Sequence, residues 1–157
     1  MNGIRNIMAA VDFSDISTHL VRYAVQLAHQ LGAAVHLVNV INQRDVEALH
    51  KVAEVTTAFS FEEHLEGMRI DRLNGLASLL ANLDIPPEDI GRHVHTGIPY
   101  ETLKEAIEEL DIDLLIMGTR GRGQFTGMLF GSTAARMLSK CPVPLLTLRN
   151  SVLGGIG

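Results

Sequence analysis

Short apolar runs alternate with helical patterns along this chain, and this alternation limits the folds that it can adopt. Between the apolar runs, apolar residues recur at steps of three and four, which is typical of amphipathic helices. Strands that alternate with helices are joined by right-handed crossovers, and they form a parallel sheet covered on both faces. The strands are expected at Ile4–Val11, Ala34–Ile41, Ile90–His95, Asp113–Met117 and Val143–Arg149.

We therefore predict a single-domain, Rossmann-like α/β fold with an open five-stranded parallel sheet. If the first strand lies between the second and the fourth, the strand order is 3-2-1-4-5, and ligands would bind beyond the carboxyl ends of the strands where this order reverses. The domain is expected to span residues 1–150, with residues 151–157 as a flexible tail.

Several residues are expected to mark the ends of the helices. Ser14 is a candidate N-cap for a helix that stops at Gly32, and Ser132 is a candidate cap for the last helix. Ser60 and Glu63 have the spacing of a capping box ahead of a long helix. Residues 42–57 are expected to form a loop with a short helix around residues 46–55.

Composition favours an intracellular protein. The chain has 157 residues, of which 46% are hydrophobic, and it has neither a membrane-spanning apolar run nor a secretory signal at its N-terminus. Cys141, the single cysteine, cannot form an intrachain disulfide, and it is expected to be a small apolar residue near a strand rather than a reactive thiol. We predict a cytoplasmic protein that does not contact a membrane.

Charge is distributed unevenly along the chain. The net charge is −5, yet the segment from residue 114 onward contains five Lys and Arg and no Asp or Glu, so the preceding segment carries −10. General nucleic-acid binding requires a broad basic surface, and we therefore expect no nucleic-acid partner. A basic patch confined to one loop suits a small anion better.

The loop from Gly118 to Ser132 is rich in glycine and lies between an apolar strand and a helical pattern. Backbone N–H groups of glycines can close on an anion, and the first turn of the following helix offers further donors at the positive end of its dipole. This arrangement predicts a phosphate-binding loop.

Two well-known phosphate loops do not fit this segment. A Walker loop would need lysine and a hydroxyl residue where this chain has Gln124 and Phe125. A dinucleotide loop would need G-x-G-x-x-G, but Thr126 follows Gly121 and Gly123 at the third glycine position. What does fit is G-x-x-G, nine residues, and then G-S.

With this spacing the chain resembles the ATP-binding members of the universal stress protein family. Further motifs extend the resemblance over nearly the whole chain apart from residues 42–60. They are V-D-F-S at residues 11–14, H-L-V-N-V-I at 36–41, G-x-P at 97–99, D-L-L-I-M-G at 113–118, and G-S-T-A with C-P-V-P-L-L between 131 and 146.

The resemblance implies a cytoplasmic stress-response protein that holds ATP at the ends of the first and fourth strands, with Mg²⁺ or Mn²⁺ on the phosphates and Ser132 as a further ligand that could reach the metal. It implies that Asp12 contacts the ribose, that the backbone near Ala10 and Val40 holds the adenine, and that the glycine loop surrounds the phosphates. The implied nucleotide-binding residues are Ala10, Val11, Asp12, Val40, Met117, Gly118, Thr119, Arg120, Gly121, Arg122, Gly123, Gly131, Ser132 and Thr133.

Other functions stay open at this point. Prolines flank the start of the last strand, and family members resembling this chain dimerise through it. Residues 143–149 are therefore expected to form a homodimer contact, which a higher oligomer could also contain. A dimerisation module that binds no nucleotide is the alternative function. Slow ATP hydrolysis is a third alternative, since no general base is evident. His93 and His95 share one face of a strand but lack a third metal ligand, so we expect a core or exposed pair.

Overall fold

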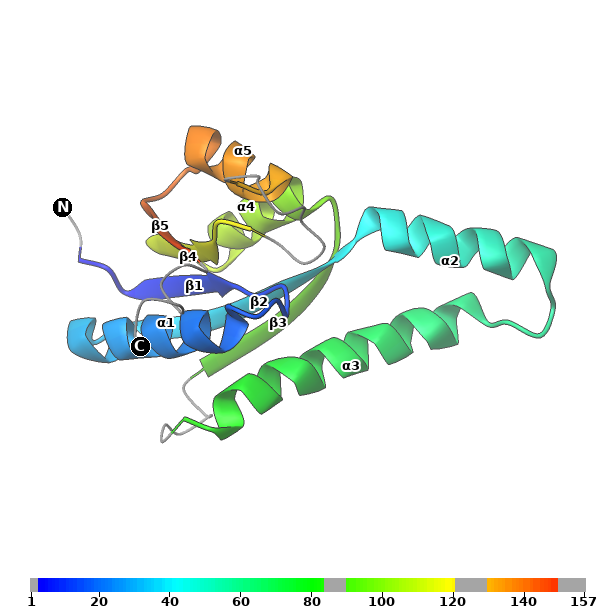
Figure 1. Ribbon diagram of the computed structural model, residues 1–157, viewed down its shortest axis with the longest axis horizontal. Helices are drawn as coiled ribbons and strands as arrows, with labels where there is room; N and C mark the ends of the chain where they lie inside the picture. The colour runs from blue at the N-terminus through cyan, green and yellow to red at the C-terminus, as the bar shows by residue number, and fades with distance from the viewer. Residues whose placement is uncertain (1–2, 84–89, 121–129, 150–157) are drawn as a thin grey trace.

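The strands form one parallel sheet in the order β3-β2-β1-β4-β5, which confirms the predicted topology (Figure 1). This computed structural model describes residues 3–83, 90–120 and 130–149. The central strand β1 contributes three side chains with no exposed surface, as expected where helices cover both faces of a sheet. The strands are β1 (Asn6–Ala10), β2 (Ala34–Asn42), β3 (Ile90–Gly97), β4 (Leu114–Gly118) and β5 (Leu145–Leu148).

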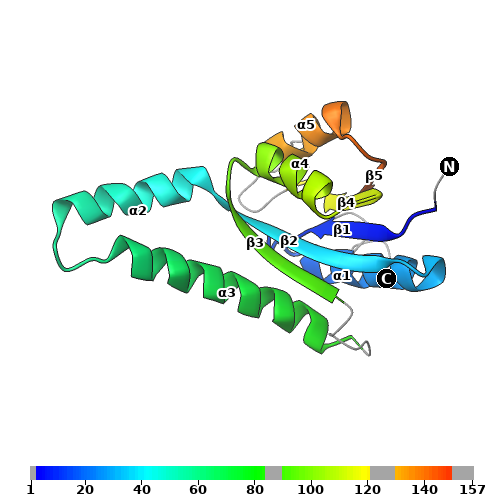
Figure 2. The same cartoon turned by 180° about the vertical axis from the view of Figure 1, so that it is seen from behind.

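Helices cover the two faces of the sheet separately (Figures 1 and 2). On one face, α1 and α3 pack over a core that includes Leu20, Leu37 and Leu76. On the other face, α4 and α5 pack over a second core that includes Met8 and Met137. The helices are α1 (Ser17–Leu31), α2 (Gln43–Val55), α3 (Phe61–Ala81), α4 (Pro99–Glu109) and α5 (Ser132–Lys140).

Two predicted caps are wrong, and both lie near strand ends that form the site described below. Ser14 does not cap α1: Ile16 occupies the N-cap position without a side-chain cap, because Asp12 has already turned the chain by accepting from the Ser14 N–H at 2.9 Å. Ser132 does not cap α5 either, since Gly131 is the N-cap and Ser132 is the first helical residue. The predicted stop at Gly32 is confirmed, with a left-handed φ of 66°.

The short helix expected around residues 46–55 is present but begins earlier, so residues that were expected to form a loop belong to it. Asn42 ends β2 and its side chain accepts from the Arg44 N–H at 3.1 Å, so α2 begins at the next residue and runs for 13 residues. Ser60 accepts from the Glu63 N–H at 3.4 Å, which confirms the serine half of the predicted capping box at the start of α3. Together α2 and α3 form a helical arm that extends beyond the sheet (Figures 1 and 2).

None of the helices within residues 3–83, 90–120 and 130–149 is both long and apolar enough to span a bilayer. The predicted tail at 151–157 and the loop residues Gly121, Arg122 and Gly123 lie outside the described residues.

Candidate functional site

A cavity of about 480 Å³ lies at the carboxyl ends of β1, β2 and β4. The strand order reverses at this point, because the chain passes from β1 to β2 on one side and β4 pairs with the other side of β1. Open α/β sheets bind their ligands in such crevices, and this volume falls within the ordinary range of ligand sites. Its described lining is Ala10, Val11, Asp12, Val38, Asn39, Val40, Asn42, Arg44, Asp45, Arg72, Pro99, Leu103, Met117, Gly118, Arg120, Gly131, Ser132, Thr133 and Ala134.

The structure brings most of the sequence-predicted site residues together in this cavity. Those that line it are Ala10, Val11, Asp12, Val40, Met117, Gly118, Arg120, Gly131, Ser132 and Thr133. Thr119 is not among the lining residues: it is buried, and its backbone joins two elements. Its N–H donates to the Leu148 carbonyl at 3.0 Å, and its carbonyl accepts from the Gly131 N–H at 2.8 Å.

The Gly131–Thr119 hydrogen bond places the start of α5 beside the end of β4. Gly131 has an extended conformation, with φ −69° and ψ 163°, and its carbonyl accepts the first helical bond, from the Ala135 N–H at 2.9 Å. The N–H groups of Ser132 and Thr133 fall in the first turn, where a helix supplies no carbonyl partner for them. Their donors and the helix dipole favour an anion at this end of the cavity.

Asp12 lies in a tight turn directly after β1. Its Oδ1 accepts from the Ser14 N–H at 2.9 Å and lies 3.5 Å from the Ser17 hydroxyl. The next residue, Phe13, has a left-handed φ of 60°, which is unusual for a residue with a large side chain. The carboxylate is therefore held in a fixed place at the rim of the cavity.

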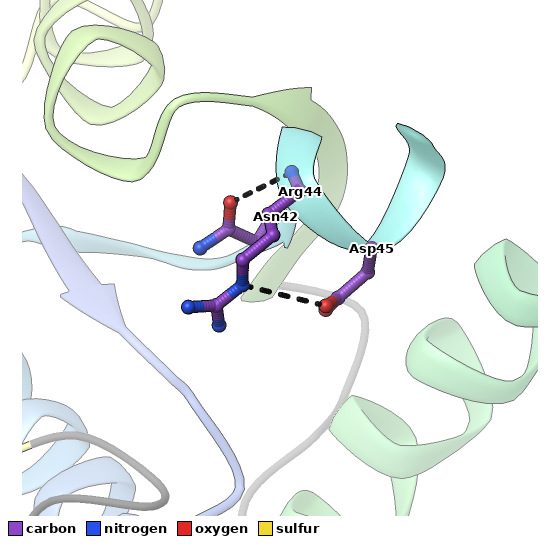
Figure 3. A network of polar contacts seen from close by, with 3 residues as sticks. All are labelled: Asn42, Arg44 and Asp45. Atoms are coloured by element: carbon purple, nitrogen blue, oxygen red, sulfur yellow. Dashed lines mark hydrogen bonds and ion pairs between the residues drawn. The ribbon is translucent and has the colours of Figure 1, made fainter. Parts of the chain in front are cut away.

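Sequence reasoning named no site residue in the helical arm. The first turn of α2 brings Arg44 and Asp45 to the cavity, with 3.9 Å between Arg44 Nε and Asp45 Oδ1 (Figure 3). Arg72 of α3 reaches the cavity as well, and its Nη1 donates to Asn39 Oδ1 at 3.1 Å. Asn39, a polar residue between apolar neighbours in β2, was the one available signal, whereas Arg72 gives none in the sequence.

The described lining carries charges of both signs. Arg44, Arg72 and Arg120 are cationic, and Asp12 and Asp45 are anionic. Such a lining suits a ligand that combines an anionic group with hydroxyl groups, because arginine donates to phosphate or carboxylate oxygens and a carboxylate accepts from hydroxyls.

The histidine pair is not part of the described lining of this cavity. His93 and His95 stack with 6.3 Å between ring centroids, and His36 of β2 joins them, with its Nδ1 3.1 Å from His93 Nε2. The described residues contain no group of three or more His, Cys, Asp or Glu that could hold a metal ion. These histidines instead form a polar contact between β2 and β3.

The His36–His93 contact predicts acid sensitivity. Burial lowers the pKa of both imidazoles below the ordinary value of 6.5, and for His93 the neighbouring His36 and His95 add to this effect while Glu109 opposes it. Because the unfolded chain then binds more protons, the stability that this pair contributes is present above about pH 6.5 and is lost as the pH falls from there toward the lowered values.

Urea unfolding between pH 7.5 and 5.5 should therefore show a falling midpoint, and the double variant His36→Gln, His93→Gln should fall less steeply. The exposed His29 provides the matched control, since His29→Gln should retain the parent slope. Equal slopes for the parent and the double variant would contradict this account.

Sequence comparison and structure comparison both match this chain to universal stress proteins. The family model described as "Universal stress protein family" matches residues 3–149. Universal stress protein G of Salmonella typhimurium is 31% identical over 135 residues, which cover 86% of this chain and 90% of the relative.

Solved structures share the fold. The solved structure of hypothetical protein MJ0577 superposes with a TM-score of 0.76 at 20% identity, and the match covers 95% of this chain and 98% of that one. Universal stress protein MJ0577 of Methanocaldococcus jannaschii is also among the sequence relatives. A universal stress protein solved in complex with cAMP superposes with a TM-score of 0.62 at 19% identity, covering 94% of this chain and 98% of its own.

Proposed function

Because this chain belongs to the universal stress protein family, we propose that its cavity holds ATP and that the protein acts in the cytoplasm as a nucleotide-dependent regulator or protective factor under stress. In this proposal Asp12 accepts from the ribose hydroxyls, and the backbone near Ala10 and Val40 borders the adenine. The glycine loop and the first turn of α5 surround the phosphates.

The observation that carries this proposal is the meeting of Asp12 with the start of α5 in one cavity. A carboxylate at one strand end and a helix N-terminus beside the next strand match the two chemically different parts of a nucleotide, the sugar and the phosphates. A family neighbour was solved with cAMP, which supports an adenine nucleotide in particular.

The described residues fit a metal ion that is bound chiefly by the phosphates. They include no cluster of carboxylates that could hold an ion alone, and Mg²⁺ in nucleotide sites commonly takes most ligands from phosphates and water. In this proposal Ser132, at the first position of α5 and in the lining of the cavity, adds one oxygen ligand. A bound Mg²⁺ or Mn²⁺ would neutralise phosphate charge there.

The proposed role is to hold the nucleotide rather than to consume it. Asp12 is the carboxylate predicted to contact the ribose, and it already accepts from the Ser14 N–H. Fast hydrolysis needs a base or water-positioning group and a cation at the transferred phosphoryl group. Slow hydrolysis is the enzymatic alternative, and product analysis with ATP would reveal it.

Nucleotide extracted from natively purified protein tests the proposal directly, together with calorimetric titration of ATP, cAMP and GTP in the presence of Mg²⁺. We expect ATP in the extract and saturable binding, with a higher affinity for ATP than for GTP. An empty extract and no binding of any nucleotide would overturn the proposal, and tighter binding of cAMP than ATP would replace ATP by cAMP.

The second part of the proposal is that the protein forms a homodimer. A homodimer that binds no nucleotide and acts through its surface is the alternative function. β5 is one edge of the sheet, and its first three residues are only partly buried, so its outer side could pair with a second copy. Sedimentation at tens of micromolar, a concentration that occupies a specific interface, should show a dimer. A monomer at that concentration would contradict this part.

A further inference from the structure

The turn that carries Asp12 has an unfavourable backbone conformation, and residues of α3 contact it. Phe13, the residue after Asp12, has φ 60°, in the left-handed region where a side chain crowds the backbone. Such a conformation persists only where its surroundings determine it. The surroundings of Phe13 therefore decide where Asp12 lies.

Gly75 of α3 provides the space for Phe13. A Cβ at Gly75 would lie 2.7 Å from Phe13 Cε1 and 2.9 Å from Cζ, both inside van der Waals contact. The aromatic ring thus lies directly against the bare backbone of the helix. Glycine weakens a helix interior, so its presence here has a packing reason.

Arg72 provides the second contact, one turn before Gly75 on the same helix. Its guanidinium carbon lies 5.8 Å from the centroid of the Phe13 ring, within the range of a cation–π contact. Its Nη1 also donates to Asn39 Oδ1 at 3.1 Å. A single side chain of α3 therefore contacts both the turn and the neighbouring strand β2.

Asn39 completes the connection to the turn. It is 2% exposed, and its Nδ2 donates to the Val11 carbonyl at 2.7 Å, directly before Asp12. The Val11 N–H donates to the Val38 carbonyl at 2.9 Å. The backbone of Val11 is thereby fixed to β2, and Arg72 orients the side-chain amide of Asn39 that holds it.

From these contacts we infer that α3 sets the position of Asp12, with Arg72 and Gly75 as positioning residues for the ribose end of the nucleotide site. The inference rests on the proposed function for its ligand, but the geometry of the turn can be measured without any ligand. Because α3 is half of the helical arm (Figure 1), displacement of that helix would alter the affinity for a nucleoside.

Two alanine substitutions on the same helix test this inference. In Gly75→Ala the new methyl group displaces the Phe13 ring, whereas in Gly67→Ala it enters open space, with nothing within 4 Å. We measure hydrogen exchange of the Ser14 amide, which donates to Asp12, by NMR without nucleotide, and the dissociation constants of ATP and of inorganic triphosphate.

For Gly75→Ala we expect the Ser14 amide to exchange at least about tenfold faster and ATP to bind at least about tenfold more weakly. The affinity for triphosphate should change little, because triphosphate lacks a ribose. Gly67→Ala should match the parent in all three measurements. Unchanged Ser14 exchange in Gly75→Ala would overturn the inference. Faster exchange with unchanged ATP affinity would overturn its link to the nucleotide site.

Arg72→Met provides a second test in case Gly75→Ala folds poorly. It keeps much of the aliphatic stem but removes the donor to Asn39, and Arg69→Met, at a half-exposed position on α3, is its control. Arg72→Met should accelerate Ser14 exchange, Arg72→Lys should restore part of the protection, and Arg69→Met should have no effect. If the parent binds no nucleotide, the proposed function fails, while the exchange data still decide whether α3 positions the turn.

Discussion

Gly131→Val should weaken ATP binding by at least about 30-fold, or about 2 kcal/mol, because it places a branched side chain where phosphate would approach the first turn of α5. Gly131 lines the cavity and has φ −69°, which valine adopts without strain. The expected loss of ATP affinity therefore comes from a side chain that blocks the phosphates from the helix amides, and not from a change in the backbone conformation.

Calorimetric titration with Mg·ATP measures the effect, and thermal unfolding of the same samples shows whether the variant keeps its fold. Gly3→Val is the matched control, since Gly3 is exposed with nothing within 4 Å of its added Cβ, and it should bind ATP like the parent. Binding by a folded Gly131→Val protein that equals the parent's would place the phosphates elsewhere.

Leu37→Ala should lower the free energy of unfolding by about 3–4 kcal/mol, the largest effect on stability that we expect from one substitution. Leu37 has no exposed surface and lies on β2, in the core that α1 and α3 cover. Removing three carbons there costs the transfer free energy of those carbons and leaves a cavity that the surrounding strands cannot close.

Urea unfolding at neutral pH measures this loss. Leu31→Ala is the matched control, because Leu31 is 47% exposed at the end of α1 and should lose less than about 1 kcal/mol. A loss of similar size in both variants would mean that the core on this face of the sheet is not closed around Leu37.

Strand order and the position of the cavity followed from local patterns because each is decided by short segments. The run at residues 114–117 is apolar throughout, which indicates a strand buried on both faces, and the right-handed crossover rule then leaves few topologies. The residues after β1 and β4 meet in any sheet with this order, so the proximity of Asp12 and Gly131 could be predicted from the sequence.

Cap residues were less predictable, since a shift of one or two residues in where the helix begins moves a serine out of the N-cap position. Ser14 and Ser132 both precede helical patterns, yet Asp12 takes the Ser14 N–H and Gly131 precedes the helix that Ser132 begins. Asn42 is the opposite case: its side chain caps α2, so this helix starts three residues before the one expected around residues 46–55.

Periodicity and glycine spacing are local properties, and they were enough to predict the sheet, its order, its family and the edge at which a ligand would lie. The presence of Arg72 and Gly75 in the surroundings of Asp12 became visible only in the folded structure. They lie 60 or more residues further along the chain, in a helix whose own pattern carries no sign of the site. Contacts of this kind depend on how an α-helix is placed over the sheet, and packing between distant segments sets that placement.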